Sequence, residues 1–147
     1  MLALAQRQGV QLVERQQCGG PGQLATYNMG VNQLCLNAAL RLDPGQRAVV
    51  VQHELVHVVQ DCLDGLSTPS SLSLAEGLRS SGALNAAQLN GFFLRYLRDQ
   101  GNLSHVVATT APLPLDSRQR EIEAYALQRD PALVSRLLRM SCGVRRP

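Results

Sequence analysis

Two histidines and a glutamate stand close together in the middle of the chain, in the segment HELVH at residues 53–57. In a helix, residues four apart lie on the same face, so His53 and His57 can present two imidazole nitrogens to one metal ion. Glu54 follows the first histidine, where its carboxylate can take a proton from a water bound to that metal. With three His and five Glu in 147 residues, composition predicts roughly 0.002 chance matches per chain. The segment therefore predicts a metal site with an adjacent general base.

The residues around this motif carry the start and stop signals of a long helix. Asp43 is suited to be its N-cap, with Pro44 at the first helical position and Gln46 as the capping-box partner. No Gly or Pro interrupts residues 47–63, and Gly65 stands where the helix is expected to end. Apolar residues on nearly every side predict that this helix is buried in a core. The many β-branched residues make a buried parallel strand the competing interpretation, but the length and the caps favour a helix.

The HExxH pattern resembles the active-site helix of the zincin metallopeptidases. Metzincins require Gly three residues after the second histidine and His six residues after it, where this chain has Gln60 and Leu63. The Gly-Thr-x-x-Asp signature of the aspzincins does not occur in the sequence either. The remaining arrangement is that of the gluzincins, in which a Glu on a second helix completes the site. The resemblance implies a Zn²⁺-dependent peptidase that acts on peptides or proteins, with Glu54 as the general base.

Three glutamates compete to be the third metal ligand. Glu121 and Glu123 lie in the segment EIEAY, which resembles the Glu-x-x-Ala ligand helix of several small gluzincin-like proteins. Glu76 stands 19 residues after the second histidine and precedes a Gly, a spacing that resembles other gluzincins. We favour Glu121, because Ala124 allows close approach of two helices and Tyr125 can hydrogen-bond a liganding histidine or a substrate oxyanion. The competing interpretation of Glu121 and Glu123 is a solvated face near a helix start.

The chain predicts a mainly helical α+β fold in a single domain over residues 1–147, similar to a minimal zincin. A small antiparallel β element packed on the active-site helix is expected between residues 24 and 37, with a turn at Asn28-Met29-Gly30. In zincins the strand ahead of the motif helix pairs with extended substrate, and residues 31–36 are the matching segment.

Further elements follow from caps and breakers along the chain. Residues 102–115 are expected to be extended, because Pro112 and Pro114 break this stretch, and His105 within it is interpreted as a surface or loop residue. Besides the motif helix, helices are expected at residues 2–16, 72–80, 85–99 (capped by Asn85), 117–129 (capped by Asp116) and 131–141.

Four cysteines, at positions 18, 35, 62 and 142, form no CxxC pair, which argues against a cysteine zinc cluster. Of the three possible connectivities we favour Cys18 with Cys35 and Cys62 with Cys142, and free buried thiols are the alternative. Disulfides would indicate an oxidising compartment, hence a secreted or periplasmic protein, whereas free cysteines would indicate a cytoplasmic one. Residues 2–5, Leu-Ala-Leu-Ala, resemble the tail of a signal peptide.

Composition excludes several classes of function. All 14 basic residues are Arg and none is Lys, which excludes Schiff-base chemistry on a lysine. The net charge of +3 is spread along the chain without a basic stripe, so nucleic-acid binding has no support. Polar residues interrupt the longest apolar run, so we expect no transmembrane span. Two other functions stay open: an inactive zincin-like binding or regulatory module, and a structural protein whose two motif histidines are hydrogen-bonded core residues.

Overall fold

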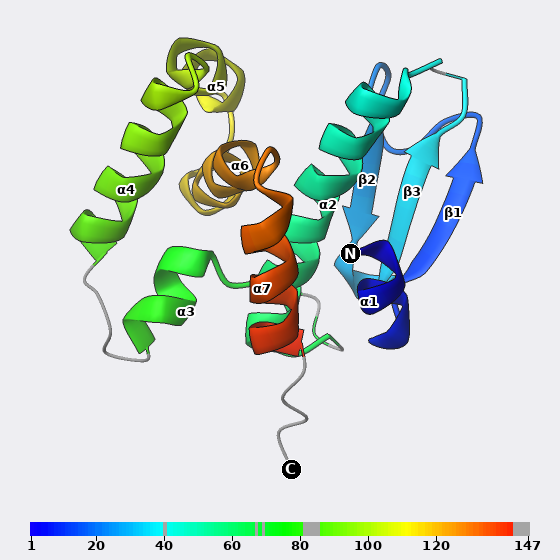
Figure 1. The fold of residues 1–147 in the computed structure, drawn as a ribbon, viewed down its shortest axis with the longest axis horizontal. Helices are drawn as coiled ribbons and strands as arrows, with labels where there is room; N and C mark the ends of the chain where they lie inside the picture. Colours follow the sequence, from blue (N-terminus) through cyan, green and yellow to red (C-terminus); the bar gives the residue numbers. More distant parts are fainter. Residues whose placement is uncertain (40, 67, 69, 81–85, 143–147) are drawn as a thin grey trace.

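The structure is a computed structural model and describes residues 1–39, 41–66, 68, 70–80 and 86–142. It is a mainly helical α+β fold, with a three-stranded sheet on one side and most of the helices on the other (Figure 1). In chain order the elements are α1 (Leu2–Arg7), β1 (Gln11–Arg15), β2 (Ala25–Asn28), the 3-10 helix η1 (Met29–Val31), β3 (Gln33–Asn37), α2 (Pro44–Asp64), α3 (Leu74–Ser80), α4 (Ala86–Asp99), α5 (Leu103–Thr110), α6 (Leu115–Leu127) and α7 (Pro131–Cys142).

The long helix α2 carries the HELVH motif and runs between the sheet and the helices α3 to α7 (Figure 1). Its start is the predicted capping box, in which the Asp43 side chain accepts a hydrogen bond from the Gln46 backbone N–H at 2.9 Å. Its last residue is followed by Gly65, whose φ of 101° lies in the region that favours glycine. The helix contacts β2, α6 and α7, and its residues Val56, Val58 and Val59 are completely buried, so burial outweighs their poor helix propensity.

The sheet has the strand order β1-β3-β2, with β2 antiparallel and β1 parallel to β3. The antiparallel pair and its turn agree with the prediction, since the Asn28 side chain accepts a hydrogen bond from the Gly30 N–H in that turn. The parallel strand β1 was not predicted. The helix expected over residues 2–16 ends at Arg7, because Gly9 takes a φ of 94° and redirects the chain into β1.

Residues 31–36, the segment expected to pair with an extended substrate, do not form an edge of the sheet. Residues 33–36 lie in β3, which is the central strand, so both of its edges are already paired. Residue 31 belongs to the preceding 3-10 helix. Strand β2 is the edge strand that contacts α2, and it therefore replaces the segment 31–36 as the candidate for strand addition.

Two expectations about the helical half were wrong. Residues 103–110 form α5 rather than an extended stretch, because the helical conformation buries Val106 and Thr110 on one face. Helix α6 begins at Leu115 after Pro114, so Asp116 lies in its first turn instead of capping it. The expected cap Asn85 lies outside the described residues.

Both disulfides have the predicted pairing, Cys18 with Cys35 and Cys62 with Cys142. The first attaches the loop ahead of β2 to β3, and the second joins the C-terminal turns of α2 and α7. Ala5 of α1 is completely buried in the core. None of the described helices is both long enough and apolar enough to cross a membrane.

Candidate metal centre

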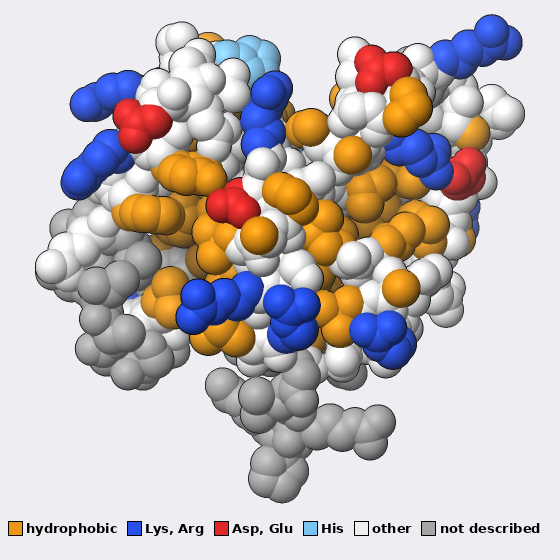
Figure 2. All heavy atoms as spheres, in the orientation of Figure 1, with side chains coloured by type: hydrophobic (Ala, Val, Ile, Leu, Met, Phe, Trp, Pro, Cys, Tyr) orange, Lys and Arg blue, Asp and Glu red, His pale blue; other side chains and the backbone are white. Residues whose placement is uncertain are grey.

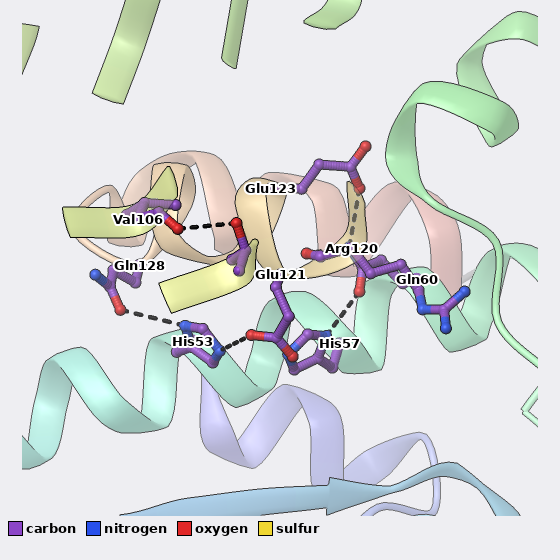
Figure 3. Close-up of polar contacts among 9 residues, drawn as sticks. His53, His57, Gln60, Val106, Arg120, Glu121, Glu123 and Gln128 are labelled. Carbon is purple, nitrogen blue, oxygen red and sulfur yellow. Dashed lines mark hydrogen bonds and ion pairs between the residues drawn. The ribbon is translucent and has the colours of Figure 1, made fainter. Parts of the chain in front are cut away.

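Helices α2 and α6 bring His53, His57 and Glu121 together, and we call these three residues the metal cluster (Figure 3). The Nε2 atom of His53 lies 3.2 Å from Glu121 Oε2, and the Nε2 atom of His57 lies 3.3 Å from Glu121 Oε1. One ligand atom from each residue can be chosen so that all three lie within 4.8 Å of one another. Neighbouring vertices of a tetrahedron with bonds of ~2.1 Å are ~3.4 Å apart. The three residues are therefore close enough together to hold one metal ion.

The tautomer of His57 is fixed by Gln60, which lies one turn later on α2. The Gln60 amide Nε2 donates to the Arg120 carbonyl at 3.1 Å and to Glu123 Oε2 at 2.9 Å. Both acceptors fix the orientation of the amide, so its Oε1 faces His57 Nδ1 at 2.8 Å. An oxygen there requires a proton on Nδ1, and in the neutral imidazole the lone pair is then on Nε2, the atom that faces Glu121.

His53 is held in the same way by Gln128, whose Oε1 lies 3.3 Å from His53 Nδ1. Gln128 is the C-cap residue of α6 and stands two turns beyond Glu121, so both lie on one face of that helix (Figure 3). Tyr125 lies between them on this face, and its ring meets the His53 ring at 70° with centroids 4.7 Å apart. Sequence reasoning missed Gln60 and Gln128, although their spacings of three and seven residues from His57 and Glu121 are the signal for a shared face.

Glu54 is buried beside the cluster, and the backbone N–H of Tyr27 on β2 faces its carboxylate. The hydroxyl of the same tyrosine donates to Asp61 Oδ2 at 2.6 Å, two turns further along α2. Tyr27 therefore joins β2 to α2 beside the carboxylate of the predicted general base. Sequence reasoning did not identify this tyrosine, because nothing in its neighbourhood indicates a partner so distant in the chain.

The cluster residues change each other's acidity strongly. Burial raises the pKa of Glu121, but hydrogen bonds from His53 and His57 outweigh it and hold that pKa far below its usual range. Burial lowers the pKa of His57, but the hydrogen bond to Glu121 and the charge of Glu54 raise it to about 9. For Glu54 itself, burial outweighs the two nearby histidines and raises the pKa. In the metal-free protein at neutral pH, a protonated His57 thus supplies the positive charge beside Glu121.

The two competing glutamates point elsewhere. Glu76 accepts hydrogen bonds from the backbone N–H and the hydroxyl of Ser73, at 2.8 and 2.7 Å, and so closes the first turn of α3. Glu123 is completely buried on the opposite side of α6 from Glu121 (Figure 3). It accepts hydrogen bonds from the backbone N–H groups of Leu74 and Ala75 and from two glutamine side chains. His105 is exposed on α5, with its ring centroid 6.3 Å from that of Tyr125.

A cleft of about 570 Å³ opens over the cluster. It is lined by His53, Glu54, His57, Glu121 and Tyr125, together with residues of β2, the first half of α2 and the end of α5. In Figure 2 the surface is hollowed at the top, between the side formed by α4 and α5 and the side formed by the sheet. The arrangement can therefore present a metal ion and a carboxylate base to a molecule that enters from solvent.

Comparisons with protein-family models, with curated proteins and with solved structures return no match to this chain.

Proposed function

We propose that this protein is a zinc-dependent peptidase. The proposal is supported above all by the metal cluster, in which two imidazole nitrogens and a carboxylate converge beside the buried carboxylate of Glu54. Zinc takes this donor set in catalytic sites and keeps a fourth position for water or substrate. His53, His57 and Glu121 would hold the ion. When bound, zinc lowers the pKa of a water molecule to about 7 and polarises a peptide carbonyl.

The chain's own residues supply the remaining steps. Glu54 takes the proton of the attacking water and passes it to the amine that leaves when the peptide bond breaks. The raised pKa of Glu54 suits this exchange, because a carboxylate with a lower pKa would bind the proton less readily. Burial and the nearby carboxylates raise the pKa of Tyr125, so its phenol stays protonated at neutral pH. That phenol lines the cleft and can donate a hydrogen bond to the oxygen that becomes negative in the transition state.

The edge of β2 is suited to hold the peptide in an extended form. The Asn37 N–H donates to the Leu24 carbonyl at 3.0 Å, which makes residues 24 and 37 a hydrogen-bonded pair of the antiparallel ladder. Because such pairs alternate, the main-chain groups of Ala25 and Tyr27 point away from β3. The Tyr27 N–H reaches Glu54, and Ala25 lines the cleft beside it. A substrate strand placed here would lie next to the general base.

The two disulfides support an oxidising compartment as the site of action. We therefore propose that the protein is secreted or periplasmic.

Replacement of Glu54 by Gln tests the proposed mechanism. The variant keeps the size of the side chain but cannot take up a proton, so we expect one bound zinc per chain and a fall in peptide hydrolysis of ~10²-fold or more. Zinc content by elemental analysis and hydrolysis of casein or a peptide mixture are the two measurements, and Glu76→Gln is the matched control that should keep both.

An active Glu54→Gln protein would contradict the mechanism. Zinc-loaded wild-type protein that cuts no peptide would instead favour the alternative function, an inactive binding or regulatory module.

A further inference from the structure

Outside the metal centre, the cleft wall carries no charge among the described residues. The ionisable residues that line it are Glu54 and the metal cluster, together with two tyrosines that are neutral at physiological pH. Residues 22–26 form one wall and are all uncharged. On the other sides the wall is formed by Val50, Thr109, Leu113 and Gln128, which are also uncharged. The charges of the cleft are therefore concentrated at the reacting centre.

Two of the arginines that stand near this wall in the sequence are already engaged. Arg47, one turn before Val50 on α2, forms an ion pair with Glu14 of β1. Arg118 donates to the carbonyl oxygens of Ala111 and Leu113, at 2.6 and 3.0 Å, and thereby ties the start of α6 to the end of α5. Neither guanidinium lines the cleft. These contacts explain why neither Arg47 nor Arg118 contributes a charge to the cleft wall.

The uncharged wall restricts which part of a polypeptide can bind. A chain terminus placed beside the reacting bond brings a charged amino or carboxylate group, which must be paired when it leaves water. In the proposed function Glu54 acts on protons and His53, His57 and Glu121 hold the metal, so the described part of the cleft wall has no further charged group to pair with a terminus. An internal segment brings only amide groups, and the edge of β2 at Ala25 offers partners for those.

We propose, resting on the peptidase function above, that the cleft binds an internal, extended and uncharged segment of a polypeptide. The protein is then an endopeptidase that cuts between uncharged residues rather than an aminopeptidase or a carboxypeptidase. Charged side chains beside the scissile bond are disfavoured because the wall offers them no partner.

Internally quenched fluorescent peptides of eight residues test this inference on the zinc-loaded protein. The parent peptide contains only Ala, Leu, Ser and Gln and is compared with blocked termini and with free termini. We expect kcat/KM to differ by less than about twofold between the two forms, and to fall about tenfold or more when Asp or Arg replaces either residue at the cut. Hydrolysis that requires a free terminus, or equal hydrolysis of the charged peptides, would overturn the inference while leaving the peptidase function intact.

A charge placed in the wall should change the preference. Thr109 is exposed and lines the cleft, so Thr109→Asp should raise the kcat/KM of the Arg-containing peptide relative to the parent by about tenfold. Ala108 is exposed at the same end of α5 but does not line the cleft, so Ala108→Asp is the matched control and should leave the ratio unchanged. The same change of ratio in both variants would contradict the assigned wall.

The inference also has a readout that does not require hydrolysis. Fluorescence anisotropy of labelled peptides on Glu54→Gln should show binding of the blocked uncharged peptide and about tenfold weaker binding of its Asp and Arg versions. If the wild-type protein cuts none of the peptides, the peptidase function and the endopeptidase assignment both fail. Binding without preference would overturn the assignment of the uncharged wall.

Discussion

Each histidine of the metal cluster uses one ring nitrogen toward Glu121 and the other toward a glutamine. Gln60 is in turn held by Glu123, a completely buried carboxylate on the side of α6 away from the cluster. This chain of contacts fixes the imidazole before a metal binds, because a flip of the Gln60 amide would place its oxygen against two other acceptors, the Arg120 carbonyl and the Glu123 carboxylate.

The convergence of His53, His57 and Glu121 could be predicted from the sequence, because an i, i+4 pair and a second helix with a small residue constrain the geometry strongly. The glutamine partners and Tyr27 could not be predicted with the same reasoning. Glutamine is mostly a surface residue, so one placed near a motif carries little information until the packing of α6 on α2 is known. Gln128 is 75 residues from His53, the residue that it contacts.

Metal binding should release protons at neutral pH. The pKa of His57 is raised to about 9, so at pH 7 this histidine is protonated in the metal-free protein, and a metal ligand must lose that proton. We expect release of about one proton per zinc at pH 7, and zinc affinity that rises up to about tenfold per pH unit until pH approaches 9. Isothermal titration calorimetry in buffers of different ionisation enthalpy measures both. Zinc affinity that stays flat between pH 7 and 9 would contradict the assigned state of His57.

At the scale of the elements, strand β2 and helix α2 are joined by a hydrogen bond between Tyr27 and the buried carboxylic acid of Asp61. Asp61 is completely buried, and its Oδ1 atom has no hydrogen-bond partner in the structure. Burial raises its pKa to about 6. The Tyr27 hydroxyl lies 2.6 Å from Asp61 Oδ2 and 3.3 Å from Asn32 Oδ1, but it has one proton for these two acceptors. When Asp61 is protonated, the acid can donate to the tyrosine and the tyrosine to Asn32, so each of the two protons has an acceptor.

Stability should therefore fall as Asp61 ionises. The folded protein holds this proton more tightly than the unfolded chain, so the stabilisation is complete below about pH 4 and is lost as pH rises through about 6. In Asp61→Asn an amide replaces the protonated acid, and we expect the loss of unfolding free energy between pH 4 and 8 to become smaller than in the wild type. Urea unfolding at several pH values measures this difference, with the exposed Asp99→Asn as control. An unchanged pH profile in Asp61→Asn would contradict the role of the buried acid.

The elements differ in how well local sequence predicts them. Helix α2 was predicted almost to its ends, because its capping box and Gly65 are local signals that the packing does not oppose. The short elements α1, β1 and α5 were missed or misassigned. Helices α1 and α5 have six and eight residues, which is fewer than three turns, so tertiary contacts such as the burial of Val106 decide their conformation. The parallel pairing of β1 with β3 joins segments about 20 residues apart and has no local signature.

At the scale of the whole molecule, the sheet and the helical half meet on α2, and each side of this boundary has its own disulfide. Cys18–Cys35 lies within the sheet region and spans 17 residues, whereas Cys62–Cys142 connects α2 to α7 and spans 80 residues. Because α2 also carries both histidines, the second disulfide fixes the helix of the metal cluster to the end of the described chain.

Removal of the long disulfide should cost more stability than removal of the short one. In the chain-entropy model, closing a loop of 80 residues stabilises by about 4 kcal/mol and closing one of 17 residues by about 3 kcal/mol. We expect urea unfolding of Cys62→Ala/Cys142→Ala to show the larger loss of unfolding free energy, compared with Cys18→Ala/Cys35→Ala. A larger loss in the short-loop variant would show that local packing, rather than loop closure, decides the contribution of each bridge.

The proposed function rests on the metal cluster, and zinc titration of three proteins is the most direct test of this cluster. We expect the wild-type protein and Glu76→Ala to bind one zinc per chain with similar affinity, because Glu76 is occupied by Ser73 at the start of α3. Glu121→Ala should remain folded by circular dichroism and lose zinc affinity by more than about 100-fold, beyond the effect of removing a residue that only orients a ligand. Wild-type zinc affinity in folded Glu121→Ala, with loss of zinc in Glu76→Ala, would contradict the assigned cluster.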